Sequence, residues 1–453
     1  MAGGWSALEL GVAQLVRTGV QAFELDQKAL GLSVVNDGAM RDTELYRQLL
    51  GLEAPWSVER VELSVGDQRV DVWAGHTPGR TWPCPECGAE LGLYDHAEER
   101  AWRHLDSCGF MTWLHARPPR VHCPTHGVRQ VGLPWAEPHS RFTALFERLA
   151  IDVLKETDVA GASAILGTSW DETWGLMERA VRRGQAAKPP RVPELVGVDE
   201  KAARKGHDYL TVVCDLERAT VEYIADDRKR ESLDGYFETL SAEERAEVKA
   251  VAMDMWPAYI NSVQAHLPDP EKKTVFDRFH VMKHMGEAVD TVRKGEHRAL
   301  RAQGLDILTG SKYLWLYSEE NLPERHKQRF ATLRQANLKT ARAWAIKERL
   351  RWLWSYRRAG WARRFWKQWY FWATHSRLKP VIEVARLIHR HFQGVFNFFS
   401  YRVTNAVAEG LNSKIQTIKK MAYGFRNPEH FKTAIFFHCG GLQLYPATHG
   451  NPG

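Results

Sequence analysis

Two short apolar runs that each end in an aspartate decide the fold: residues 195–199 are Leu-Val-Gly-Val-Asp, and residues 248–254 are Val-Lys-Ala-Val-Ala-Met-Asp. Working outward from them, the chain alternates strand-like and helix-like patterns, at 209–214, 220–224, about 231–247, about 257–267 and 273–277. The resulting order is strand, strand, strand, helix, strand, helix, strand. A meander followed by helix-linked strands predicts a mixed α/β sheet whose later strands run in parallel.

The two aspartates suggest a metal site. If their strands are neighbours, Asp199 and Asp254 lie at the same edge of the sheet, where carboxylate oxygens suit Mg²⁺ (or Mn²⁺). Two ions about 4 Å apart would serve phosphoryl transfer. An aspartate that ends a strand is also common as a plain turn residue, and this alternative stays open for either residue alone.

A third acidic residue occurs in a helical stretch near the C-terminus. There, polar residues recur at spacings of four, three and four, which places them on one face of a helix: Asn405, Glu409, Asn412 and Gln416. A buried polar stripe needs a partner, and a metal ion would supply one. Glu409 is therefore the candidate for the third metal-binding acid.

Two short knuckles predict a zinc site. The first is the C-x-x-C pair Cys84 and Cys87, and the second contains Cys123 and His126. Both spacings are typical of zinc ligands, and thiolates with an imidazole suit a tetrahedral ion. Because four protein ligands leave no open position, one structural Zn²⁺ is expected. The alternatives are free thiols, or a ligand set that uses one of three nearby residues: Cys108, His122 or His104.

Residues 141–183 have the pattern of a helix-turn-helix. Helices are expected at 141–156 and 158–166, and a turn at Gly167 precedes the Ser169/Glu172 capping box of a third, basic helix. Such patterns are often simply packed helices, but the neighbouring zinc knuckles and the basic chain favour DNA binding. The candidate DNA contacts are Ser169, Trp170, Thr173, Arg179, Arg182 and Arg183.

A basic, tryptophan-rich segment follows the predicted sheet. Residues 321–400 contain 18 Lys plus Arg but only 3 Glu and no Asp, and seven Trp lie between 344 and 372. Phosphate neutralisation and base stacking would use such residues, whereas the alternative is a Trp-filled helical bundle with a solvated basic face. The candidate DNA contacts here and in the later helical stretch are Arg357, Arg358, Arg363, Arg364, Lys414, Lys419 and Lys420.

Composition excludes several classes of protein. The 453-residue chain is 44% hydrophobic and 26% charged, with a net charge of +7 and pI about 9.0, so a disordered chain is excluded. No apolar run reaches the roughly 20 residues of a membrane span, and six Cys are too few for a disulfide scaffold. The N-terminus lacks the pattern of a signal peptide. We expect a cytoplasmic protein with no membrane partner.

Several of these motifs together resemble one family. The stretch 405–427, NAVAEGLNSKIQTIKKMAYGFRN, closely resembles the final motif of the ISL-three family of bacterial insertion-sequence (DDE-type) transposases. Residues 195–200, 252–259 and 276–283 also look like that family, as does the order of zinc knuckles, helix-turn-helix and α/β core. The resemblance covers about 41–445. It departs at His126, where the family pattern leads us to expect Cys, and zinc accepts either residue.

The resemblance implies a ribonuclease-H-like core with an Asp-Asp-Glu triad, carried over as Asp199, Asp254 and Glu409. It also implies that Asp277 and His280, which match a further motif, lie near the site, with Asn405 as additional support. The implied activity is that of a DNA transposase that binds terminal inverted repeats and target DNA. Two Mg²⁺ ions would serve cleavage and strand transfer by a homo-oligomer on DNA, associated with the bacterial nucleoid. The alternatives are a non-catalytic DNA-binding regulator and a nuclease without strand transfer.

These patterns divide the chain into consecutive segments. Met40 is the expected natural start, although a short N-terminal helix packed on the body is an equal alternative for the residues before it. The expected segments are an upstream extension 1–39, a β-rich zinc-binding domain 40–140, a helix-turn-helix 141–184, a linker 185–193, the first part of the core 194–300, a helical insertion 301–400, the Glu-bearing part of the core 401–445 and a tail 446–453.

Overall fold

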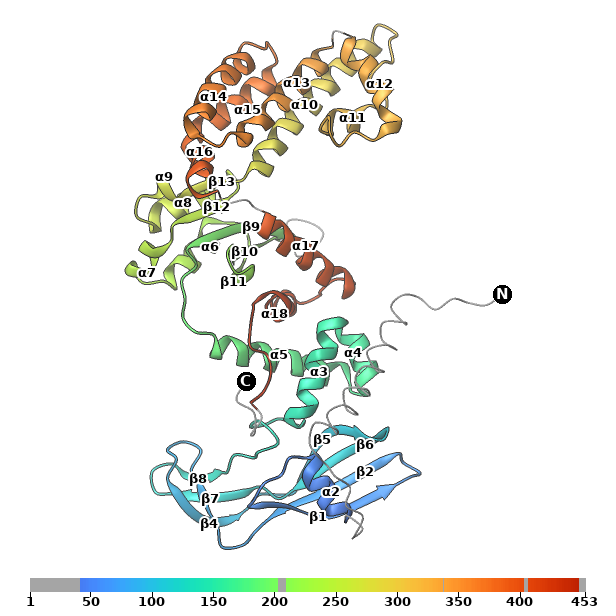
Figure 1. Ribbon diagram of the computed structural model, residues 1–453, viewed down its shortest axis with the longest axis vertical. Coiled ribbons are helices and arrows are strands. Elements are labelled where there is room, and N and C mark those ends of the chain that lie inside the picture. The colour runs from blue at the N-terminus through green and yellow to red at the C-terminus, as the bar shows by residue number, and fades with distance from the viewer. Residues whose placement is uncertain (1–40, 203–208, 337, 403–405, 448–453) are drawn as a thin grey trace, which may run out of the picture. The chain divides into compact units, whose positions relative to one another are not determined.

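The computed structural model describes residues 41–202, 209–336, 338–402 and 406–447 (Figure 1). The chain forms two compact units, the first ending at Thr143 and the second beginning at Ala144. The expected extension 1–39, Asn405 and residues 448–453 of the expected tail lie outside the described residues. In the described part of the chain, no helix is long and apolar enough to cross a membrane.

Between residues 41 and 143, the first unit forms two four-stranded sheets and the helix α2 (Asp42–Leu49). One sheet has the order β1-β2-β6-β5, formed by β1 (Trp56–Ser64), β2 (Arg69–His76), β6 (Phe110–Ala116) and β5 (Arg100–Ser107). The other has the order β3-β4-β7-β8, formed by β3 (Thr81–Pro83), β4 (Glu90–His96), β7 (Pro119–Cys123) and β8 (Gly127–Gln130). The hairpin expected at 57–75 is confirmed as β1–β2.

Tryptophans form the core of the first unit. Trp56 packs edge-on against Trp135, with ring centroids 4.7 Å apart, and Trp102 is fully buried beside Trp135. Val70 and Val72 of β2 point into the same core, as expected for alternate residues of a strand with one buried face. Trp82 of β3 and Val121 of β7 belong to the same cluster, so this apolar core also supports the second sheet.

The second unit begins with three helices: α3 (Ala144–Glu156), α4 (Val159–Leu166) and α5 (Trp170–Ala187). Gly167 ends α4 in the left-handed conformation at φ 64°, which a glycine adopts at little cost. Ser169 then caps α5, and the Glu172 side chain returns a bond to the Ser169 backbone, so the expected capping box is confirmed.

A five-stranded mixed sheet follows, with the order β11-β10-β9-β12-β13. Its strands are β9 (Leu195–Ala202), β10 (Tyr209–Asp215), β11 (Thr220–Asp226), β12 (Ala250–Met253) and β13 (Thr274–Phe276). The first three strands form an antiparallel meander, and β12 and β13 extend the sheet in parallel from β9. The expected mixed sheet is confirmed.

Short helices connect the parallel strands: α6 (Arg230–Glu238), α7 (Ala242–Glu247), α8 (Pro257–His266) and α9 (Pro270–Lys273). The single helix expected at about 231–247 is wrong, because α6 ends near Thr239 and α7 starts afresh. Ser241 caps α7 with a second capping box that involves Glu244, and this local signal interrupts the helical periodicity.

The segment from Arg278 onward is helical, as expected. It comprises α10 (Arg278–Arg301), α11 (Lys312–Leu316), α12 (Glu324–Gln335), α13 (Lys339–Arg351), a 3-10 turn η1 (Trp352–Ser355), α14 (Ala359–Thr374), α15 (Lys379–Arg390), α16 (Phe392–Tyr401), α17 (Ala406–Met421) and α18 (Pro428–Cys439). Helix α10 packs along α13 and α15 (Figure 1), so the helical layer begins at Arg278, inside the segment assigned to the core.

The seven clustered tryptophans are divided between the core and the surface. Four are buried: Trp344, Trp354, Trp366 and Trp369. Three are exposed: Trp352, Trp361 and Trp372. The segment therefore has the Trp-rich core expected of a helical bundle and also presents three aromatic rings at its surface, while DNA contact by that surface stays a prediction.

Candidate functional site

The zinc knuckles converge as the sequence predicts. Cys84 and Cys87 flank the turn between β3 and β4, whereas Cys123 ends β7 and His126 precedes β8. Gly88 and Gly127 adopt positive φ of 73° and 70°, which lets the chain turn sharply beside each pair. In the described part of the chain, these residues form the only group of three or more potential metal ligands whose binding atoms lie within 4.8 Å of one another.

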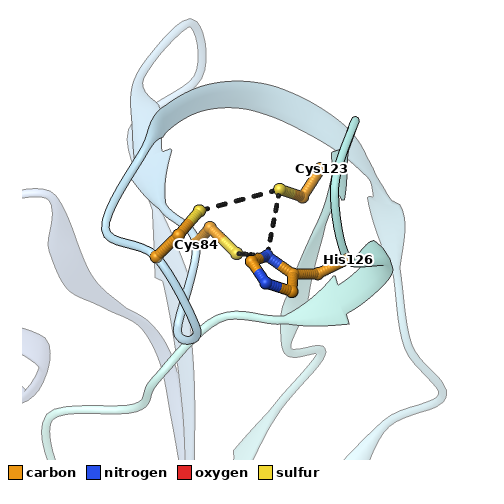
Figure 2. A group of neighbouring side chains, drawn as sticks. Cys84, Cys123 and His126 are labelled. Atoms are coloured by element: carbon orange, nitrogen blue, oxygen red, sulfur yellow. Dashed lines mark hydrogen bonds between the residues drawn. The ribbon is translucent and has the colours of Figure 1, made fainter.

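The distances within this group fit a tetrahedral zinc ion. The Cys87 and Cys123 sulfurs are 3.8 Å apart, and the Cys123 sulfur lies 3.5 Å from His126 Nδ1 (Figure 2). Zn–S and Zn–N bonds of about 2.3 and 2.0 Å place tetrahedral ligand atoms about 3.8 and 3.5 Å apart. The backbone amides of His126 and Thr125 lower the pKa of Cys123 to about 6, which favours the thiolate that zinc binds.

The alternative zinc ligands lie outside this group. His104 is buried in the first unit and shares a hydrogen bond with the Thr143 hydroxyl, 2.9 Å away. Burial and the nearby Arg103 lower the pKa of His104 to about 4. His122 packs against the Tyr94 ring, and Cys108 is exposed at a turn. The two knuckles alone supply the four ligands.

The two aspartates lie at corresponding positions of neighbouring strands. Strand β12 pairs with β9 in parallel, with Ala252 opposite Gly197. Asp199 lies in β9 two residues beyond Gly197, and Asp254 directly follows the end of β12, so both residues lie near the same end of this strand pair. Neighbouring strands are about 4.8 Å apart, so both carboxylates can reach one small cation. The strand pair therefore brings two hard oxygen donors to the same end of the sheet.

Helix α17 contacts this edge of the sheet through Asn412. The Asn412 amide donates to Asp199 Oδ2, and α17 packs against β9. Glu409 lies three residues earlier, so it is on the same face of α17 as Asn412. Glu409 is exposed, and among the described residues it does not form a ligand cluster with the two aspartates. The sequence places Asn412 on the polar face but does not indicate its bond to Asp199.

His280 supports Asp254 from the first turn of α10. Its Nδ1 lies 3.1 Å from Asp254 Oδ2, and its Nε2 lies 4.0 Å from the buried Asp277. Burial acts to raise the pKa of Asp254, but the bond to His280, the charge of His280 and the Met255 amide together lower it. Burial likewise opposes protonation of His280, yet the contact with Asp254 raises its pKa overall. Asp254 is thus held as an anion.

Three of the residues expected to contact DNA from the helix-turn-helix bind protein groups instead. Thr173 is fully buried and bonds to Ser163 and Thr168. Arg179 and Arg183 bind the buried carboxylate of Glu147, at 3.0 and 2.7 Å. These three residues therefore bind protein groups in this structure, and the burial of Thr173 excludes it as a DNA contact; sequence spacing does not tell the inner face of a short helix from its outer face. Of the remaining residues, Ser169 serves as the cap, and Trp170 and Arg182 are exposed.

The basic surface of the helical layer is exposed as expected. Arg357, Arg358, Arg363 and Arg364 all reach solvent, and the Arg364 guanidinium lies 5.1 Å from the centre of the exposed Trp361 ring. On α17, Lys414 donates to the His438 carbonyl and Lys419 to the Ala202 carbonyl, whereas Lys420 is exposed. The arginines and Lys420 thus remain available to phosphates.

Comparisons with known proteins agree with these features. Residues 196–435 match a family model described as a transposase of the DDE type and the ISL3 family. Residues 80–126 match the zinc-finger of transposases IS204/IS1001/IS1096/IS1165, and residues 132–181 match the helix-turn-helix domain of transposase family ISL3.

Two curated relatives cover nearly all of the chain. The transposase for insertion sequence element IS1001 of Bordetella parapertussis is 30% identical over 398 residues, which are 86% of this chain and 97% of the relative. The transposase for insertion sequence element IS1557 of Mycobacterium tuberculosis is 26% identical over 444 residues, which are 91% of this chain and 99% of the relative.

Proposed function

Because this chain belongs to the ISL3 family of insertion-sequence transposases, we propose that Asp199, Asp254 and Glu409 form the acidic triad with which it cuts and joins DNA. The observation that carries the proposal is the parallel pairing of β9 and β12, because Asp199 of β9 and Asp254, which follows β12, then lie near the same end of the pair. The bond from Asn412 to Asp199 supports the third position, because it fixes the helix that bears Glu409 against the same strand.

We assign the core to the ribonuclease-H-like class. The assignment is supported by a five-stranded sheet in which a three-stranded meander is extended by two parallel strands. The acids occupy the central strand, the end of its parallel neighbour and a later helix. A long helical insertion separates the second acid from the third in the sequence.

The carboxylates fit Mg²⁺ (or Mn²⁺), which prefers oxygen ligands. When bound, two such ions supply an activated water and stabilise charge on the attacking and leaving oxygens. The chain's own residues prepare that site. The Glu200 and Met255 amides bind one oxygen of Asp199 and Asp254 at 2.7 and 2.6 Å, while Asn412 and His280 contact the other. Each carboxylate is thereby oriented before DNA arrives.

We assign zinc binding and DNA binding to different parts of the chain. The Cys84, Cys87, Cys123 and His126 group would hold one structural Zn²⁺. The exposed Trp170 and Arg182 of α5 and the arginines of the helical layer would bind the terminal inverted repeats and target DNA. We further propose that the protein works as a homo-oligomer on DNA, associated with the nucleoid in the cytoplasm.

Single substitutions in the triad test the proposal. Asp199→Asn, Asp254→Asn and Glu409→Gln should each abolish cleavage of a duplex that carries the element's end, while the affinity for that duplex stays near wild type. Glu200→Gln is the matched control, because the side chain next to Asp199 points to the opposite face of β9 and pairs with Arg228. Cleavage at the wild-type rate by a triad variant would remove that residue from the site. Binding without any cleavage by the wild-type protein would favour the regulator.

A further inference from the structure

A groove of about 590 Å³ lies between the start of α10 and the helices α11 and α13. Glu409 lines it from α17, and Arg278, Phe279 and Trp354 line it from α10 and η1. The volume is within the range of about 300–1,000 Å³ typical of sites for small organic groups. The groove is therefore large enough for a single nucleotide but not for a duplex.

Three buried polar atoms at this groove lack a hydrogen-bond partner among the described residues; one, Glu348 Oε1, lies 3.3 Å from the Lys347 ammonium, and the other two can donate. The two donors are the indole nitrogen of Trp354, a residue that is only 6% exposed, and the hydroxyl of Ser318. Buried donors are nearly always satisfied in native proteins, and those that are not call for a partner outside the protein. Both residues line the groove, so a ligand with hydrogen-bond acceptors could accept a hydrogen bond from each of them.

The remaining lining offers what a nucleotide requires. The Phe279 ring is 57% exposed and presents a flat face for a base. The exposed Arg278 guanidinium lies 5.6 Å from the centre of the Trp354 ring, where it can meet a phosphate. Aromatic faces combined with arginine are the usual means of binding unpaired bases.

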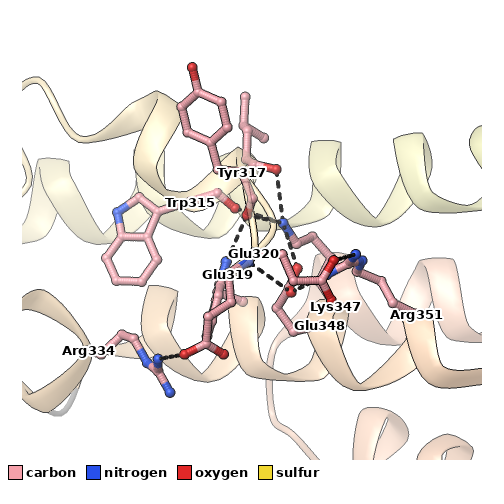
Figure 3. Close-up of polar contacts among 10 residues, drawn as sticks. Trp315, Tyr317, Glu319, Glu320, Arg334, Lys347, Glu348 and Arg351 are labelled. Atoms are coloured by element: carbon pink, nitrogen blue, oxygen red, sulfur yellow. Dashed lines mark hydrogen bonds and ion pairs between the residues drawn. The ribbon is translucent and has the colours of Figure 1, made fainter. Parts of the chain in front are cut away.

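A rigid polar network forms the opposite wall. The buried Lys347 ammonium donates to the carbonyls of Trp315, Leu316 and Tyr317 at 3.0–3.1 Å (Figure 3). Glu348 accepts from Arg351 at 2.8 Å, and Arg351 also binds Glu320. The charged groups of Lys347, Glu348 and Arg351 are thus paired within the protein. Arg278 is the exposed cation among the residues described as lining the groove.

The groove adjoins the proposed triad at two points. Glu409 is part of its lining, and His280, the neighbour of Phe279, contacts Asp254. We propose that the groove holds one unpaired nucleotide of the DNA strand, next to the bond that is cut. This inference rests on the proposed function of the triad. It assigns Phe279, Trp354, Ser318 and Arg278 to substrate binding.

Photocrosslinking tests the occupant directly. The probe is a duplex of the element's terminal sequence, read from the DNA that flanks the gene, with an unpaired 5-iodouracil placed in turn at each position around the cut. Irradiation of the full-length protein on this probe, without divalent ions, should attach one position to the tryptic peptides Phe279–Lys283 or Trp352–Arg357. Crosslinks that map only to other peptides would overturn the inference.

Two variants exclude a trivial loss of folding. Phe279→Ala changes an exposed ring, and Trp354→Phe keeps an aromatic ring in the core but removes the N–H. Each should weaken binding of the unpaired probe, by roughly 5- to 150-fold for a lost stacking ring, while binding of the fully paired end is retained. Tyr313→Ala, which removes another exposed ring of the helical layer, is the control and should change neither. Equal loss for paired and unpaired probes would overturn the inference.

The results of these experiments also distinguish a failure of the nucleotide site from a failure of the proposed function. A wild-type protein that binds and cuts the paired end in Mg²⁺ but makes no crosslink to either peptide contradicts the nucleotide site alone. A protein that neither binds nor cuts the end contradicts the proposed function.

Discussion

Replacing Glu147 with Gln should destabilise the second unit strongly. Glu147 is 2% exposed, and its two carboxylate oxygens bind Arg179 at 3.0 Å and Arg183 at 2.7 Å. The substitution keeps the shape of the side chain but leaves two guanidinium groups without their anion. Removing one partner of a buried ion pair costs about 3–5 kcal/mol. Because both arginines reach solvent in part, we take the lower end, about 3 kcal/mol.

Thermal unfolding measures this effect. At about 2–4 °C per kcal/mol for large domains, Glu147→Gln should lower the Tm of the second unit by about 6–12 °C. Glu156→Gln, at an exposed position of the same helix, is the control and should shift the Tm by about 1–2 °C or less, as surface substitutions usually do. Equal shifts for the two variants would refute the structural role of Arg179 and Arg183 and return these arginines to the list of DNA contacts.

Three further predictions concern other parts of the chain. Replacing Arg357, Arg358, Arg363 and Arg364 with Ala should reduce the log–log salt slope of DNA binding by up to about 3.6, at about 0.9 per lost phosphate contact; an unchanged slope with intact circular dichroism would assign these residues to a solvated surface. Cys123→Ser should release zinc and destabilise the first unit, because a structural site contributes folding free energy directly; metal analysis that finds no zinc in wild-type protein would contradict this. Burial and Lys414 lower the pKa of His438 to about 4, whereas a histidine in an unfolded chain has a pKa of about 6.5. Between these two values the unfolded state binds a proton that the folded state does not, so the free energy of unfolding falls as the pH drops from 6.5 towards 4. In urea unfolding, the loss between pH 7 and pH 5 should be smaller in His438→Gln by up to about 2 kcal/mol, and equal losses would show that His438 stays solvated.

Local signals made much of the fold predictable. The two apolar strands, the Ser169 capping box and the two knuckles each depend on residues that are close in the sequence, and the structure contains all of them. The expectation that Asp199 ends its strand is wrong, because β9 continues to Ala202 by pairing with β10. The broken helix at 231–247 carried its own signal in Ser241 and Glu244, but the helical periodicity on both sides obscured it.

The features that sequence patterns could not supply all depend on distant partners. Arg179 and Arg183 look like free cations until Glu147 of α3 is packed against them. Asn412 becomes relevant to the site only through Asp199, 213 residues away. The tryptophans could not be divided between core and surface, because spacing alone does not say which face of a helix meets its neighbours.

Iron-directed cleavage of the protein backbone tests the triad most directly. Fe²⁺ takes the place of Mg²⁺ in oxygen-ligand sites, and with ascorbate and peroxide it cuts the chain near the bound ion. If Asp199, Asp254 and Glu409 share one site on DNA, cuts should appear near all three positions, disappear with excess Mg²⁺ and be lost together in Asp254→Asn. Cuts near the aspartates that never include the Glu409 region, or that excess Mg²⁺ does not suppress, would contradict the proposed site.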